Sequence, residues 1–314
     1  MRSTDTGDCI LLVGHGSRNS KGNDEIMAFA KQWQADNTQW QIETCFIEFA
    51  DVMLDQGLDN AVKRIKGGAS RVIVVPLILN AAGHVKMEIP AHIEKARQRH
   101  TKTEFIYARH LGATESILKI LKRRLRSAMA ELDMPDPKTT GVIVLGRGSS
   151  DRVANGELAK MTRWLFEEGD HELVDMAFTG ITHPRLELAV QRQVKLGMSQ
   201  VVVLPYYLFT GTLIERIQRQ VQHLQTQYPQ TRFAAADYFG FEKEIAELMS
   251  QHVHEAQQQL SSGQMECDGC QYRELAEEHG HGHQHAHEHS RSHAHDHHHH
   301  DTPHAHESEK ESVA

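Results

Sequence analysis

The hexapeptide LVGHGS at residues 12–17 returns as VLGRGS at residues 144–149, and this repetition decides how the chain is organised. A second pair, VIVVPLIL at 72–79 and VVVLPYYL at 201–208, recurs at nearly the same spacing. Each member contains a short apolar run of the kind expected for a buried parallel strand. Two such pairs in the same order indicate an internal duplication.

Short apolar runs alternate with amphipathic segments of helical length throughout residues 9–258. This alternation is typical of parallel sheets with helices on both faces, so we expect an α/β protein of two similar doubly wound lobes. Open sheets of this kind bind ligands at the carboxyl ends of their strands, here in a cleft between the lobes. Strands are expected at residues 9–13, 41–46, 71–75, 104–107, 141–145, 173–178, 200–204 and 232–235. Helices are expected at residues 23–34, 54–66, 86–98, 114–132, 154–166, 184–195, 214–227 and 242–258.

The domain boundaries follow from the repeat and from shifts in composition. The last segment contains 14 of the 24 histidines and has almost nothing to bury, so we expect a disordered His-rich tail. The predicted parts are an N-terminal lobe at 1–133, a Pro-containing linker at 134–140, a C-terminal lobe at 141–260, a Cys-x-x-Cys segment at 261–278 and the tail at 279–314.

Composition and charge exclude several classes of protein. With 39% hydrophobic and 24% charged residues, the 314-residue chain can bury a sizeable core. The net charge of −8 argues against duplex nucleic acid as a partner. Neither an apolar run of about 18 residues nor a signal peptide is present, which argues against a membrane partner. Four cysteines do not make a disulfide framework, so we expect a cytoplasmic protein.

Two histidines distinguish the first repeat from the second. His15 and His84 follow neighbouring strands, whereas the second repeat has Arg147 and residues 211–213, which contain no histidine, at the matching places. A site confined to one lobe would explain this asymmetry. Glu88 lies four residues after His84, on the same face of the expected helix. Imidazole and carboxylate together suit a borderline divalent ion such as Co²⁺, Fe²⁺ or Ni²⁺.

Further charged residues lie near the same loops. Glu48 ends the second strand, where a carboxylate commonly caps the next helix. Beside two histidines it could instead hold a substrate group or accept a proton. Basic residues here could pair with an acidic substrate, although such residues are usually only solvated. They are Arg18, Lys21, Lys86 and Arg147.

Cys267 and Cys270 form a Cys-x-x-Cys motif after the second lobe. Alone, this motif is compatible with zinc, a redox dithiol or half of an iron–sulfur site. Cys9 and Cys45 fall in predicted strands, where a buried structural thiol is expected. A cluster shared between the subunits of a homodimer would complete the set of ligands.

Four motifs together resemble the class II tetrapyrrole chelatases, and in particular the long sirohydrochlorin cobaltochelatases of the CbiX type. They are VGHGS at 13–17, FIE at 46–48, the segment 75–90 and GRGSSD at 146–151. The resemblance covers residues 9–258 and extends to the Met-x-Cys-x-x-Cys motif and the His-rich tail. It implies a chelatase fold of two similar lobes.

The resemblance also implies roles for particular residues. The metal is expected on His15 and His84, with these two and Glu88 as the catalytic residues. The second lobe is expected to add Arg147 and Glu215 to the substrate site, and an iron–sulfur cluster is expected at Cys267 and Cys270. The tetrapyrrole is further expected to contact Glu48 and the loop Leu79, Asn80, Ala81, Ala82, Gly83 and His84.

The activity implied by the resemblance is insertion of Co²⁺ into sirohydrochlorin on the anaerobic route to cobalamin. Insertion removes two pyrrole N–H protons, and histidine can both hold the ion and accept a proton. Insertion of Fe²⁺ into the same ring, giving siroheme, is an alternative that the ligand types do not separate. A non-enzymatic metal store or metallochaperone is a third hypothesis, and the tail is expected to supply or buffer metal.

Overall fold

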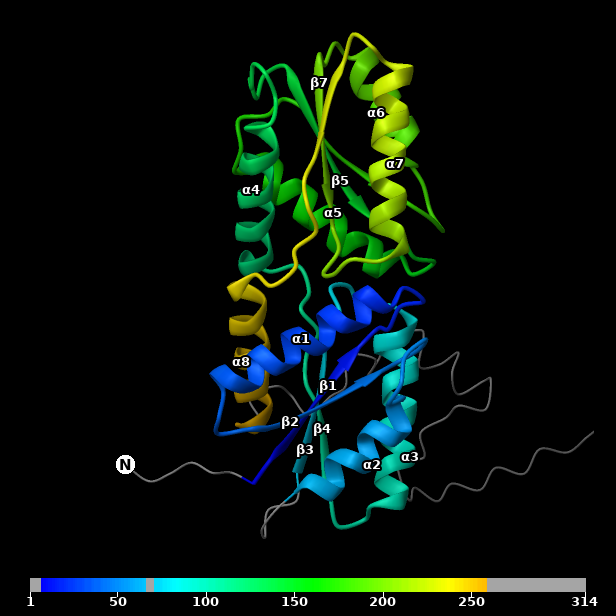
Figure 1. Cartoon of the computed structure of the whole chain (residues 1–314), viewed down its shortest axis with the longest axis vertical. Coiled ribbons are helices and arrows are strands. Elements are labelled where there is room, and N and C mark those ends of the chain that lie inside the picture. Colours follow the sequence, from blue (N-terminus) through cyan, green and yellow to red (C-terminus); the bar gives the residue numbers. More distant parts are fainter. Residues whose placement is uncertain (1–6, 66–70, 259–314) are drawn as a thin grey trace, which may run out of the picture. The chain divides into compact units, whose positions relative to one another are not determined.

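The computed structural model describes residues 7–65 and 71–258, in which eight strands form two four-stranded parallel sheets (Figure 1). The first sheet has the order β2-β1-β3-β4, and the second has the matching order β6-β5-β7-β8. The first sheet consists of β1 (Cys9–Gly14), β2 (Gln41–Phe46), β3 (Arg71–Pro76) and β4 (Glu104–Tyr107). The second consists of β5 (Thr140–Gly146), β6 (Val174–Phe178), β7 (Gln200–Pro205) and β8 (Arg232–Ala235). The predicted fold class is confirmed.

Helices cover both faces of each sheet, because successive strand residues point to opposite sides. In β1, Ile10 and Leu12 pack in one buried cluster with Trp33, while Leu11 packs in another with Ile93. The helices of the first repeat are α1 (Ser20–Asp36), α2 (Leu54–Arg64), a π-helical turn (His84–Glu88), α3 (Ile89–Arg99) and α4 (Glu115–Met129). Those of the second are α5 (Arg152–Glu167), α6 (Leu186–Lys195), α7 (Thr212–Gln227) and α8 (Lys243–Gln257). No helix in the described part of the chain has the length and apolar character that a membrane span requires.

The last helix of each repeat packs on the other repeat. Helix α4 contacts β7 and β8 of the second sheet and helix α5 of the second repeat, and α8 contacts β3 of the first sheet. The Trp33 indole on α1 donates to Ser250 Oγ on α8 at 2.9 Å. The sequence repeats therefore do not coincide with the packing units. The predicted linker at 134–140 lies between α4 and β5, except for Thr140, which begins β5. The exact domain boundaries stay predictions.

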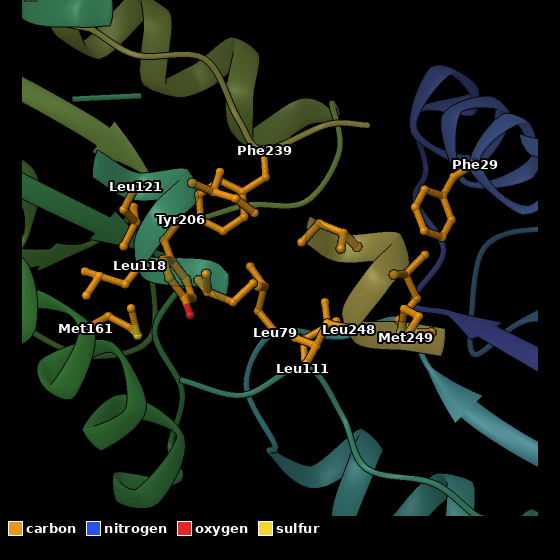
Figure 2. Packing of buried hydrophobic residues seen from close by; sticks show 14 of the residues in the cluster. Phe29, Leu79, Leu111, Leu118, Leu121, Met161, Tyr206, Phe239, Leu248 and Met249 are labelled. Carbon is orange, nitrogen blue, oxygen red and sulfur yellow. The ribbon is translucent and has the colours of Figure 1, made fainter. Parts of the chain in front are cut away.

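One hydrophobic cluster joins the two sheets through these exchanged helices. It contains Leu118 and Leu121 of α4, Tyr206 after β7, and Leu248 of α8 (Figure 2). Buried residues of both β1 and β5 belong to it. Because the cluster is continuous, the loops that leave both sheets are fixed against one common core.

Candidate metal centre

The His15 loop follows β1 and is fixed by a close approach to the loop after β2. The Glu48 amide donates to the His15 carbonyl at 3.1 Å. Gly16 has a φ of +88°, and a Cβ there would lie 1.7 Å from the Glu48 carbonyl oxygen. Only glycine fits this position, so the glycine flank of His15 is what brings the Glu48 segment beside it.

His84 begins the π-helical turn that follows the loop after β3. The Ile89 amide donates to the His84 carbonyl, which is the wider i to i+5 spacing of a π-helix. The same turn brings His84 Nδ1 to 2.6 Å from Glu88 Oε2. This carboxylate orients the ring, so that the other ring nitrogen, Nε2, remains for a ligand.

His15, Glu48 and His84 converge. One ligand atom from each residue can be chosen so that all three lie within 4.8 Å of one another. The two imidazole rings stand edge to face, with centroids 4.7 Å apart. Two ligand atoms that each lie about 2.1 Å from one ion are at most about 4.2 Å apart. The three atoms here lie within 4.8 Å of one another, so a small side-chain movement would allow all three to bind one ion. Two imidazoles and one carboxylate form a donor set suited to a borderline divalent cation.

The His15 ring is held in its neutral form. Burial lowers its pKa below 6.5, and the nearby His84 and Arg147 lower it further, against the opposing effects of the Gly16 carbonyl and Glu48. A neutral imidazole has a lone pair available for a metal, whereas a protonated ring has none. The neutral His15 ring therefore has one lone pair that can serve as a metal ligand or as a hydrogen-bond acceptor.

The second lobe contributes Arg147, whose Nη1 lies 3.0 Å from His15 Nε2. Glu215 does not join the three-residue cluster; its Oε1 accepts a hydrogen bond from the Asn19 side chain at 3.1 Å. Asn19 caps the N-terminus of α1, so Glu215 contacts the helix that follows the His15 loop. The role of Glu215 toward a substrate stays a prediction.

The loop from Leu79 to Gly83 is fixed by a residue that sequence reasoning missed. Glu157 of α5 accepts from the Ala81 amide at 3.1 Å through Oε2, and its Oε1 lies 2.9 Å from His110 Nε2. Asn80 Oδ1 is buried and has no hydrogen-bond partner in the described structure. No sequence signal marked Glu157, because a glutamate on a helix is usually solvated.

Lys86 is a correction to the sequence analysis. We expected it near the cleft, where it could meet an acidic substrate, but its ammonium group is buried and lies 2.6 Å from Asp151 Oδ2. Asp151 also caps the N-terminus of α5, and Asn19 holds the equivalent place in the first repeat. This Asn-to-Asp difference between the repeats is a signal that could have indicated the ion pair.

A family model for CbiX matches residues 9–128 and again residues 141–256. The chain belongs to the CbiX family. It is 41% identical to a sirohydrochlorin cobaltochelatase of Priestia megaterium over 272 residues, covering 86% of both chains. It is 31% identical to a sirohydrochlorin ferrochelatase of the same organism, covering 80% of this chain and 91% of the relative. Among solved structures, SirB from Bacillus subtilis with Fe³⁺ matches with a TM-score of 0.70 at 28% identity, covering 82% of this chain and 98% of SirB. The resemblance drawn from the sequence motifs is confirmed.

The other CbiX-type features named from the sequence fall outside the described residues. Cys267 and Cys270 lie there, as does the His-rich tail at 279–314. Cys9 and Cys45, by contrast, are buried free thiols in β1 and β2, as expected. Burial raises the pKa of the Cys9 thiol to about 12, so this thiol is protonated at neutral pH and fits the expected structural role.

Proposed function

We propose that this protein is a sirohydrochlorin cobaltochelatase, which inserts Co²⁺ into the ring with loss of two pyrrole protons. The observation that carries the proposal is the convergence of His15, Glu48 and His84 at the carboxyl ends of neighbouring strands. The 41% identity with a cobaltochelatase over most of both chains supports cobalt as the metal. Insertion of Fe²⁺ is the second candidate, favoured by the 31% identical ferrochelatase.

In the proposed mechanism the metal is a substrate that the two histidines and Glu48 hold before transfer. The metal forms bonds to the ring nitrogens as its bonds to these residues break. Each of two pyrrole N–H groups loses its proton, so the +2 charge that enters is balanced by two protons that leave. Glu88, 2.6 Å from His84 Nδ1, stabilises the charge on the His84 ring if that ring accepts a proton.

The substrate contacts belong to the same proposal. The loop from Leu79 through Asn80, Ala81, Ala82 and Gly83 to His84 would border the ring, with Arg147 and Glu215 facing it from the second lobe. Asn80 Oδ1, buried without a hydrogen-bond partner among the described residues, is an acceptor that a pyrrole N–H could satisfy. Sirohydrochlorin carries eight carboxylates, so a guanidinium such as that of Arg147 suits its edge.

We further propose roles for the segments outside the described residues. Cys267 and Cys270 would supply ligands to an iron–sulfur cluster, completed by a second subunit of a homodimer. The tail at 279–314 would raise the local concentration of Co²⁺ by weak, reversible binding to its histidines. A cytoplasmic setting, where the buried thiols Cys9 and Cys45 stay reduced, belongs to the same proposal.

The test is an anaerobic absorbance assay of sirohydrochlorin with Co²⁺, Fe²⁺ or Ni²⁺. We expect insertion above the protein-free rate, lost in His15→Ala and His84→Ala. His100→Ala is the matched control, because His100 also pairs with a carboxylate, Asp59 at 2.7 Å, but lies at the far end of α3. Metal binding without any tetrapyrrole-dependent spectral change would contradict the proposal and favour a metal store.

A further inference from the structure

Arg147 and His15 occupy the same position in the two repeats, and their side chains meet. Arg147 follows β5 as His15 follows β1, and Arg147 Nη1 lies 3.0 Å from His15 Nε2. The loops that carry them have the same shape, with φ angles of +88° at Gly16 and +85° at Gly148. The contact therefore joins a cation of the second lobe to a candidate metal ligand of the first.

This contact fixes which His15 nitrogen carries the proton. A guanidinium has only N–H donors and no acceptor, so Nε2 must be the acceptor. In the neutral ring the proton then lies on Nδ1. That assignment agrees with the other contacts of Nδ1, because the Gly16 carbonyl oxygen lies 3.1 Å away and Glu48 Oε1 lies 3.4 Å away.

The Arg147 contact is incompatible with a metal on either nitrogen of His15. A metal on Nε2 needs the lone pair that Arg147 occupies. A metal on Nδ1 requires the ring proton to move to Nε2, where it would face the N–H of the guanidinium. In both cases a second cation would also stand close to Arg147.

We propose that Arg147 is a displaceable cation, which occupies His15 until the metal binds and then pairs with a carboxylate of the tetrapyrrole. The inference rests on the proposed function. It assigns to Arg147 the coupling between the two substrates of the protein, the metal ion and the tetrapyrrole. Arg147 is exposed, so its side chain can turn from His15 to a substrate without breaking a buried contact. Coupling between two binding sites is reciprocal, so a carboxylate that draws Arg147 away also strengthens metal binding at His15.

Arg147→Met in the full chain tests this inference, with Arg163→Met as the matched control. Arg163 lies on the exposed face of α5 and pairs with Glu167, so its substitution removes the same charge from the same lobe. Co²⁺ is titrated anaerobically and followed by its visible absorption bands. Each of these proteins is also titrated with His15→Ala added. The Co²⁺ absorption that remains there belongs to the tail, and it is subtracted from the absorption of the protein that retains His15.

We expect Arg147→Met to bind Co²⁺ about three- to tenfold more tightly than the unsubstituted chain. The gain corresponds to removing one competing hydrogen bond and one nearby positive charge. The KM for sirohydrochlorin should rise about two- to fivefold. Arg163→Met should change neither value. Tighter metal binding is a result that general damage to the fold would not give.

Two outcomes would overturn the inference. If the His15-dependent absorption was present and Arg147→Met bound Co²⁺ no more tightly than the unsubstituted chain, Arg147 would not compete with the metal. If the KM were unchanged, the carboxylate contact would be wrong. Loss of the His15-dependent absorption in the unsubstituted chain, with no insertion above background, would instead overturn the proposed function itself.

Discussion

Lys86→Met should destabilise the protein far more than an equivalent change at the surface. Lys86 and Asp151 are 7% and 1% exposed, and their charged atoms lie 2.6 Å apart. Removing one partner of a buried ion pair costs about 3–5 kcal/mol, because the other charge stays buried without its counter-ion. Asp151 keeps a hydrogen bond from the Val153 amide at 2.8 Å, so we expect a loss of about 3 kcal/mol.

The matched control is Lys122→Met. Lys122 lies 2.8 Å from Glu168, nearly the same separation, but the two side chains are 36% and 45% exposed. An exposed pair contributes less than about 1 kcal/mol. The measurement is the free energy of unfolding from urea denaturation of both variants and the parent chain.

A double variant separates the ion pair from other effects of the substitution. Asp151→Asn keeps a good N-cap residue for α5 and removes the charge. Lys86→Met combined with Asp151→Asn should therefore be more stable than the sum of the single changes predicts, by about 1 kcal/mol or more. Equal losses for Lys86→Met and Lys122→Met would refute the reasoning, since burial would then have no effect on the strength of the pair.

Three further predictions test the loop, the exchanged helix and a buried histidine. Gly16→Ala should abolish Co²⁺ insertion and weaken Co²⁺ binding, because its Cβ would lie 1.7 Å from the Glu48 carbonyl; unchanged binding would show that the loop adapts. Ser250→Ala should lower the free energy of unfolding by about 1–3 kcal/mol, because it leaves the buried Trp33 N–H without its acceptor. A loss no larger than in Ser127→Ala, at an exposed position of α4, would contradict this. Burial lowers the pKa of His252 below 6.5, so the unfolded chain binds more protons and the protein should lose stability as the pH falls below 6.5. His252→Asn should flatten that pH dependence in urea denaturation, and an unchanged slope would contradict the assignment.

The strands were the most predictable elements, because the central strands β1, β3, β5 and β7 consist mainly of continuous apolar runs. The helix ends were less predictable where polar side chains set them. We expected the first helix to begin at residue 23, but it begins at Ser20, because Asn19 caps it through a bond from the Lys21 amide. The segment 86–98 was expected as one helix and instead opens with a π-helical turn. Pro90 has no N–H to donate to the carbonyl of residue 86, so the helix cannot keep regular spacing there.

The candidate site was predictable in part. The glycine flanks and the difference between the repeats indicated His15 and His84, and the same sheet edge indicated Glu48. The contact of Arg147 with His15 was not predictable, because it depends on how the two sheets share one core. For the buried Lys86, the change from Asn19 to Asp151 between the repeats was the one sequence signal, and it does not by itself identify the partner of Asp151. An amphipathic pattern identifies the apolar face of a helix but not the sheet that it covers, so the exchange of α4 and α8 was missed as well.

The same loop scaffold gives opposite chemistry in the two repeats. The Ser17 amide donates to Asn23 at 2.8 Å, and in the second repeat the Ser149 amide donates to Asn155 at 2.9 Å. The two loops thus share one backbone shape and present different side chains, His15 in the first repeat and Arg147 in the second. Because the helices are exchanged and the core is continuous, both loops are fixed relative to the same packed residues. A duplicated fold in this way sets the candidate metal ligand His15 and the cation that we propose competes with the metal, Arg147, one hydrogen bond apart.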